Sequence, residues 1–178
     1  METLTKTTWV IDPTHSEVGF KVKHLVISTV TGTFKRFEGI LETETEDFTD
    51  ANCSFKLDVS SIDTNVADRD ARLRSDDFFS AEHFPSINFS NGKLIQNGDS
   101  YQLVGNLTVK GISKEVALDV DLGGVMVDPH GQTKAGFEIN GKINSREFGL
   151  TWNAVTAAGG VVFGDEVKLH LHVQVVRQ

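Results

Sequence analysis

Apolar and polar residues alternate along most of this chain, and this period of two limits the possible fold more than any other feature. In one run, Cys53, Phe55, Leu57 and Val59 alternate with polar residues. Successive side chains of a β-strand point to opposite faces, so such a run indicates a strand with one buried face. About eight runs of this kind follow one another at regular spacing, and turn-forming residues separate most of them.

The order of the runs predicts the architecture. No helical run lies between successive strands in the rhythm of a parallel βαβ sheet. Asn97-Gly98 separates two runs, and this pair favours an antiparallel hairpin because both residues tolerate positive φ. Regular spacing is typical of a sandwich or of a closed up-and-down barrel, but several strands of roughly eight to ten residues are long for a sandwich. We therefore predict an all-β fold with about eight antiparallel strands closed into a barrel.

The apolar side of these strands predicts the residues of the interior. The chain contains 12 Phe and 1 Tyr, and many of the Phe lie on this side. A solid core would explain them, and so would an apolar cavity with few polar groups; the alternation does not distinguish the two. We expect these residues to face one interior: Phe20, Val22, Phe55, Leu57, Phe89, Leu103, Leu107, Phe137, Ile139, Leu169 and Leu171.

The segment Ser60–Pro85 is the long exception to the alternation, because its apolar residues follow a helical spacing. It predicts a short helical insert over about residues 63–80. Asp63, Thr64 or Asn65 can begin the helix, since a short side-chain oxygen accepts hydrogen bonds from the open N–H groups of the first turn. Acid–base pairs four residues apart favour the helix further: Asp68 with Arg72, and Asp70 with Arg74.

The insert ends in aromatic residues, and two roles are open for it. A closed barrel gives an aliphatic chain no lateral entrance, so access must be through an end or past a movable segment. Phe78 and Phe79 can close apolar surface over a bound chain, which would make the insert a gate. The alternative is a fixed cap in which Arg69, Arg72 and Arg74 only pair with neighbouring Asp residues.

No constellation of residues predicts an enzyme site. His170 and His172 lie two apart on one predicted strand and could share a metal, but no Cys, Asp or Glu ligand pattern accompanies them. We interpret both as solvent-facing and expect no metal. Cys53 lies on the apolar side, where we expect an inert thiol. His15 and His24 flank one predicted strand, and we interpret them as hydrogen-bonded structural residues.

Charge and the N-terminus narrow the partners and the location. The net charge of −8 argues against nucleic acid as a partner, because phosphates require a clustered basic surface. The segment METLTKTTWVID lacks the apolar core of a signal peptide. We therefore expect a cytoplasmic protein if Met1 is the natural start, and a periplasmic one if the chain has been trimmed.

Five segments carry a more specific signal: WVIDPTHSEVGFKVKHL (Trp9–Leu25), TGTFKRFEGIL (Thr31–Leu41), SSIDTNVADRDARLRSDDFFSAEHFP (Ser60–Pro85), GNLTVKGISKEV (Gly105–Val116) and EFGLTWN (Glu147–Asn153). In this order and at this spacing they resemble the YceI-like family of polyisoprenoid-binding proteins. The resemblance extends from Trp9 to about Val175, which is nearly the whole chain.

The resemblance implies a lipocalin-like fold, an extended eight-stranded antiparallel barrel with the helical insert near one opening. Residues 1–178 would form this single domain. Members of the family bind long isoprenoid chains, such as polyprenyl lipids or isoprenoid quinones, and homodimers are common among them. For this chain the resemblance therefore implies an isoprenoid lipid or quinone as ligand, a homodimer, and no cofactor.

The inward strand faces, the aromatic insert and the matched motifs together predict the residues of the site. The lipid-binding candidates are Phe20, Val22, His24, Phe34, Phe37, Phe55, Leu57, Phe78, Phe79, Phe89, Leu103, Leu107, Phe137, Ile139, Phe148, Trp152, Leu169 and Leu171. The head-group candidates are Arg69, Arg72 and Arg146. Arg72 stands where the family often has His, and Arg146 follows Ser145, where the family often has Arg.

Three functions are open at this point. The first is non-enzymatic binding, carriage or sequestration of the lipid in the interior; burial contributes about 0.8 kcal/mol per CH₂, so a long chain needs little polar recognition. The second is an enzyme acting on an apolar or isoprenoid substrate at the barrel mouth, with His24 or His15 as acid–base and Arg72 or Arg69 holding an anion. The third is a solid barrel that acts through its surface.

Overall fold

The computed structural model describes residues 6–24, 28–44, 48–76, 78–150 and 163–178. These ranges contain one α-helix, α1 (Ala67–Arg74), and the 3₁₀ helices η1 (Pro13–His15), η2 (Val59–Ser61) and η3 (Ser145–Phe148). The strands are β1 (Thr7–Ile11), β2 (Glu17–His24), β3 (Ser28–Phe34), β4 (Phe37–Thr43), β5 (Asn52–Asp58), β6 (Ile62–Asp63), β7 (Ser86–Asn97), β8 (Ser100–Val109), β9 (Ile112–Val127), β10 (Thr133–Asn144) and β11 (Phe163–Arg177).

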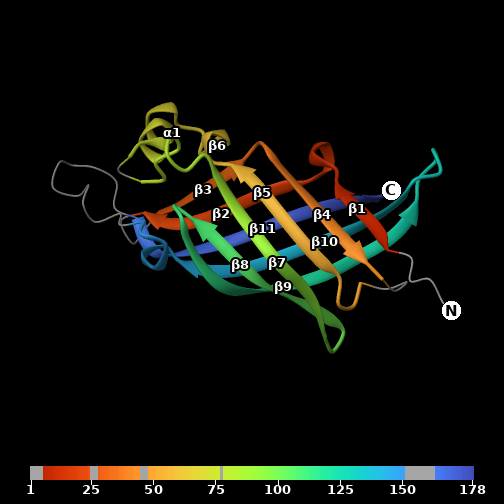
Figure 1. Ribbon diagram of the computed structural model, residues 1–178. Helices are drawn as coiled ribbons and strands as arrows, with labels where there is room; N and C mark the ends of the chain where they lie inside the picture. The colour runs from red at the N-terminus through yellow and green to blue at the C-terminus, as the bar shows by residue number, and fades with distance from the viewer. Residues whose placement is uncertain (1–5, 25–27, 45–47, 77, 151–162) are drawn as a thin grey trace.

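All these strands join in one antiparallel sheet that closes on itself (Figure 1). The order is β1-β4-β5-β7-β8-β9-β10-β11-β2-β3-β6, and a pairing of β1 with β11 closes the ring. β1 and β2 follow one another along β11, interrupted by η1, and β3 and β4 follow one another with only Lys35 and Arg36 between them. The two-residue β6 adds only to the end of β3. If β1 with β2, and β3 with β4, are each counted as one strand of the barrel, these two and β5, β7, β8, β9, β10 and β11 make eight. They form the closed eight-stranded antiparallel barrel that the sequence predicts.

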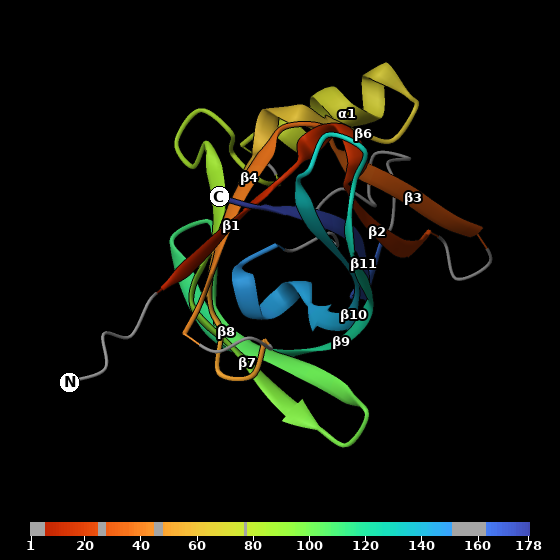
Figure 2. The same ribbon diagram turned by 90° about the vertical axis from the view of Figure 1, so that its right-hand side faces the viewer.

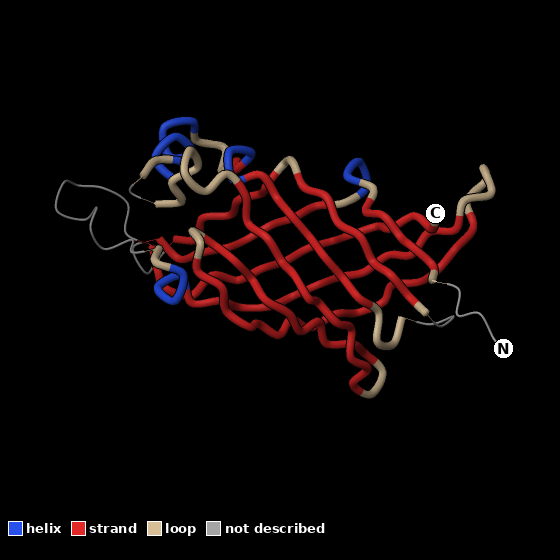
Figure 3. The backbone as a smooth tube through the Cα atoms, viewed as in Figure 1, coloured by secondary structure: helices blue, strands red, loops and turns tan. Residues whose placement is uncertain are grey.

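The barrel is long, and its strands wind diagonally around it (Figure 3). Viewed along its length, the strands form a ring (Figure 2). α1 lies at one end, which we call the helix end, and the turn between β9 and β10 lies at the other, which we call the hairpin end (Figure 1). No helix among the described residues has the length and apolar character that a membrane span requires.

Buried side chains form two clusters, one toward each end of the barrel. The cluster at the helix end includes Leu73 of α1 and Phe78 behind it. The cluster at the hairpin end includes Trp9 of β1 and Phe48, which precedes β5. Several half-buried wall residues pack against both clusters: Phe55, Leu107, Val116, Leu169 and Leu171.

The predicted start of the helix is wrong. α1 begins after Val66, which makes no side-chain cap hydrogen bond. Asp63 instead accepts a hydrogen bond from the backbone N–H of Asn65, at 2.8 Å. Thr64 donates with its backbone N–H and its hydroxyl to the buried side chain of Asp70. The expected capping residues therefore form the turn before the helix and bind the helix from the side.

The predicted Asp–Arg pairs of the insert are not formed in the described residues. Asp70 accepts from Thr64 rather than from Arg74, and no ion pair joins Asp68 to Arg72. The hairpin expected at Asn97-Gly98 is present one residue further along, because Asn97 still pairs with Ser100 and the turn consists of Gly98 and Asp99. Gly98 has φ of 63°, as a residue in this kind of turn requires.

Candidate functional site

An apolar cavity of about 180 Å³ lies inside the barrel. Every strand except β6 contributes to its wall, together with Leu73 of α1 and with Phe79 and Leu150. Members of both core clusters border it, so it extends along the barrel axis. A cavity of roughly 150 Å³ with such a lining can stay dry and hold a benzene-sized molecule, so this interior is already open to an apolar guest.

The lining of the cavity is uncharged. Among the described residues it consists of apolar side chains, of Gly19 and of the Cys53 thiol. Burial raises the pKa of Cys53 to about 11, so its thiol stays protonated at neutral pH. A charged group placed inside would lose its hydration without gaining a partner, whereas hydrocarbon gains from burial. The cavity is therefore suited to the hydrocarbon part of a ligand.

The ring of Phe89 shows how the walls leave room for this cavity. It lies over Gly92 and Gly105, where an added Cβ would come within 2.4 Å and 2.5 Å of carbon atoms of the ring. Because Gly92 and Gly105 have no side chain, the ring of Phe89 can pack directly against the backbone of the barrel wall. Any larger residue at either position would push the ring away from the wall.

At the helix end, the insert closes over the cavity. Leu73 and Phe79 line the cavity, and the ring of Phe79 meets that of Phe34 edge-on with centroids 6.3 Å apart. The backbone N–H of Phe79 donates to the carbonyl of Leu73 at 3.1 Å, which holds the aromatic tail against α1. Phe78 is completely buried beside them without lining the cavity. The insert is thus packed into the barrel as well as placed over it.

At the hairpin end, Phe48 is buried against Trp9 and Phe137. It is only 4% exposed, and its ring lies 5.2 Å from that of Trp9 and 5.0 Å from that of Phe137 between centroids. The Nε1 atom of Trp9 is buried and has no hydrogen-bond partner among the described residues, a state that costs about 1–3 kcal/mol. Sequence reasoning missed Phe48, although a lone Phe directly after the acidic run Glu42–Asp47 is a usable signal.

The structure brings most of the predicted lipid-binding residues together around the cavity, including the whole set expected to face one interior. Whether they contact a lipid stays a prediction. Those that line the cavity are Phe20, Val22, Phe34, Phe55, Leu57, Phe79, Phe89, Leu103, Leu107, Phe137, Ile139, Leu169 and Leu171.

The other predicted residues lie elsewhere. Phe37 stacks on Phe55 with centroids 6.1 Å apart and packs against the core cluster at the helix end, but it borders a second groove and does not line the cavity. Phe78 and Phe148 are buried behind the lining. The side chain of His24 and the whole of Trp152 lie outside the described residues.

The lining also includes residues that the prediction omitted. Val18 and Ile87 precede Phe20 and Phe89 by two positions on the same strand face, and Val173 continues the face of Leu171. Alternation places them on the apolar side of their strands, and only the list of lipid-binding candidates left them out. Leu73 could not be found in this way, because it lies on α1.

The head-group candidates do not line the cavity. Arg69 donates through Nε to the Thr64 hydroxyl at 2.8 Å and through Nη2 to the Thr64 carbonyl at 2.6 Å. Arg72 is exposed on α1, and Arg146 is exposed in η3. Arg69 is therefore held inside the insert, and a head-group role for the other two stays a prediction.

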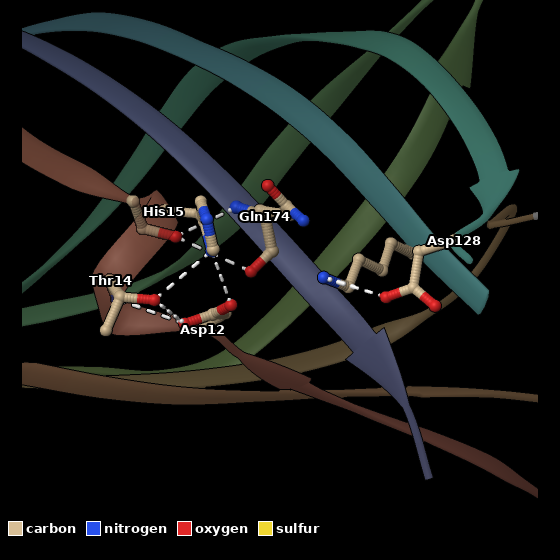
Figure 4. A network of polar contacts seen from close by, with 7 residues as sticks. Asp12, Thr14, His15, Asp128 and Gln174 are labelled. Atoms are coloured by element: carbon tan, nitrogen blue, oxygen red, sulfur yellow. Dashed lines mark hydrogen bonds and ion pairs between the residues drawn. The ribbon is translucent and has the colours of Figure 1, made fainter. Parts of the chain in front are cut away.

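A polar network holds the corner between β1 and β2 (Figure 4). Asp12 accepts hydrogen bonds from the backbone N–H and hydroxyl of Thr14, and its Oδ2 lies 2.8 Å from Nδ1 of His15. The backbone N–H of Gln174 on β11 donates to the Ser16 hydroxyl at 2.9 Å. His15 is exposed and does not line the cavity, so its contacts are those of a structural residue.

Comparisons of the sequence identify relatives. A family model described as a YceI-like domain matches residues 9–175. A UPF0312 protein of Staphylococcus epidermidis is 40% identical over 158 residues, which span 88% of this chain and 90% of the relative. A UPF0312 protein of Serratia proteamaculans is 37% identical over 163 residues, which span 92% of this chain and 82% of the relative.

Solved structures share the fold. The Campylobacter jejuni YceI protein is 30% identical with a TM-score of 0.67, over 98% of this chain and 97% of the other. BcnA of Burkholderia cenocepacia gives a TM-score of 0.79 at 21% identity, over 92% and 98%. A polyisoprenoid binding domain of Saccharophagus degradans gives 0.72 at 13% identity, over 97% and 98%. At the two lower identities the likeness shows the fold alone.

Proposed function

The chain belongs to the YceI-like domain family, and we propose that it binds a long isoprenoid lipid and carries or sequesters it without catalysing a reaction. The observation that carries this proposal is the cavity, which is apolar wherever described residues line it and extends between the two core clusters. Burial of hydrocarbon contributes about 0.8 kcal/mol per CH₂, so the part of an isoprenoid chain that enters the cavity would be held without polar contacts.

The class of ligand rests on two further points. The Saccharophagus degradans domain, which has the same fold, is named for polyisoprenoid binding. The lining formed by the described residues is uncharged and offers no site for a head group, so the polar end of a polyprenyl lipid or isoprenoid quinone would remain at an end of the barrel. Arg72 and Arg146 are the exposed cations proposed to meet it.

Binding is favoured over catalysis by the surroundings of the candidate catalytic groups. His15 is bound to Asp12 at the outer corner between β1 and β2. Arg69, one of the two residues that could hold an anion, is bound to Thr64. In the described residues, neither lies beside a cavity where a substrate could meet it.

The proposal is tested by identifying what the protein carries. The untagged protein is purified from cells, extracted with organic solvent, and the extract is analysed by mass spectrometry against an equal mass of a soluble control protein. We expect an isoprenoid lipid or quinone enriched in the extract, and uptake of a polyprenyl alcohol by the delipidated protein. A protein that carries no isoprenoid and takes up none contradicts the proposal.

A cavity-filling variant connects the lipid to the interior. Leu107 lines the cavity on β8, and Asn106 precedes it on the outer face of the same strand. We expect Leu107→Trp to lose most of the uptake of polyprenyl alcohol, and Asn106→Trp to retain it. Overpacking costs about 1–3 kcal/mol, so thermal unfolding must show that both variants are folded. Equal uptake by two folded variants would place the lipid outside the barrel.

A further inference from the structure

Three strands bring polar side chains together on the outside of the barrel wall. His170 and His172 lie on the same face of β11. On β10, Asn140 is paired with His170 and Glu138 is paired with His172. On β2, Glu17 is paired with His172 from the other side. Sequence reasoning found no further ligand for the two histidines, because Glu138 is a neighbour only through the strand register.

The distances are those of a set of metal ligands. Nε2 of His170 lies 3.1 Å from Nε2 of His172, and 3.7 Å from Oε1 of Glu138. One ligand atom from each of the three residues lies within 4.8 Å of the others. Two nitrogen ligands on a tetrahedral Zn²⁺ are about 3.3 Å apart when each metal–nitrogen bond is about 2.0 Å. The side chains of His170 and Glu138 are 43% and 45% exposed, so an ion can reach them from solvent.

Asn140 orients the first histidine. Its Oδ1 lies 2.6 Å from Nδ1 of His170. A carbonyl oxygen accepts, so this contact places the proton on Nδ1 and leaves the lone pair of Nε2 facing His172. Hydrogen bonding of the second ring nitrogen to an amide or carboxylate is the usual way in which a protein orients a histidine ligand. The two Nε2 atoms lie at hydrogen-bond distance, and a cation bound by both lone pairs would take the place of that hydrogen bond.

We propose that Glu138, His170 and His172 bind one divalent transition-metal ion of the Zn²⁺ class on the outer wall of the barrel. Two imidazoles and a carboxylate suit such an ion, and three protein ligands leave a coordination position for water. Glu17, across from His172, adds negative charge beside the site. The side chains of these residues point away from the interior, so the site is separate from the lipid cavity.

The proposal is tested with untagged protein freed of metal by a chelator and titrated with ZnCl₂ in a calorimeter. We expect one Zn²⁺ per chain, and at least about a tenfold loss of affinity in both His172→Asn and Glu138→Gln. His130→Asn, in the exposed turn between β9 and β10, is the matched control and should bind as the wild type does. Circular dichroism and uptake of polyprenyl alcohol, which the outer wall should not influence, show that each variant is folded.

Two results would overturn the metal site. One is an absence of Zn²⁺ binding to the wild-type chain, which would leave the two imidazoles sharing a proton. The other is unchanged binding by a folded His170→Asn/His172→Asn double variant, which would place the bound ion elsewhere. Because uptake of polyprenyl alcohol is measured separately, either failure is distinguishable from a failure of lipid binding.

Discussion

At the scale of single residues, the corner between β1 and β2 depends on the ionised form of Asp12. Hydrogen bonds from Thr14 and His15 to its carboxylate lower the pKa of Asp12 from 3.8 to about 2. A group whose pKa is lower in the folded than in the unfolded protein stabilises the fold above its unfolded pKa. This contribution is lost as the pH falls through the folded pKa, here between about pH 4 and pH 2.

We therefore expect Asp12→Asn to lower the melting temperature at pH 7, because the charge-assisted hydrogen bonds are lost. The expected cost is about 1 kcal/mol, since the side chain is partly open to solvent. The difference from the wild type should shrink as the pH falls from 4 to 2, because the wild-type carboxylate becomes increasingly protonated as the pH approaches its pKa of about 2. Melting temperatures of both proteins across this range test the prediction. Asp99→Asn, in the exposed turn between β7 and β8, removes the same charge as a control, and a difference that stays constant with pH would contradict the prediction.

At the scale of elements, the contacts of the insert indicate how it should respond to a ligand. Leu73 and Phe79 line the cavity, so a bound chain would touch both of them. We expect amide hydrogen exchange over residues 66–76 to slow when the lipid binds, because the added contacts stabilise the closed position. The turn between β9 and β10, far from α1, is the internal control (Figure 1). Unchanged exchange in the insert, with lipid demonstrably bound, would identify it as a fixed cap.

The strands could be predicted from the sequence because alternation is a local property with one physical cause. A barrel buries one face of every strand, so Phe20, Leu107 and Leu169 reveal their direction through their immediate neighbours. The start of α1 could not be predicted in this way. Thr64 has the side chain of a capping residue, but its partner is the buried carboxylate of Asp70, and this pairing depends on how the insert folds back on itself.

In the candidate sites, too, some residues could be predicted from local alternation and others depend on tertiary contacts. Most of the cavity lining follows from alternation, but Phe48 reaches the interior from a loop, where alternation carries no information. Phe78 and Phe148 do not lie on strands either, so alternation could not show that they are buried behind the cavity lining. The ligand set on the outer wall required the register of β10 against β11, which places Glu138 beside His172.

At the scale of the whole molecule, one strand edge extends beyond its neighbour. β8 pairs with β9 as far as Val120, opposite Tyr101, whereas β10 pairs with β9 as far as Val127. In the described residues, β9 therefore has a free edge beyond Val120. Val125, Met126 and Val127 are 52%, 60% and 63% exposed on this segment. An exposed apolar strand edge readily pairs with another chain.

We expect a second copy of the chain to cover this edge, which would give the homodimer that the family resemblance implies. Met126→Lys should convert the dimer to a monomer, because a lysine on a strand edge opposes pairing with another strand. Size-exclusion chromatography with light scattering measures the mass of each species. Ile95→Lys makes the same change at an exposed position of β7, at 44% exposure, and should leave the dimer intact. A wild-type chain that is monomeric at high concentration, or a dimer that Ile95→Lys dissociates and Met126→Lys does not, would show that the β9 edge is not the interface.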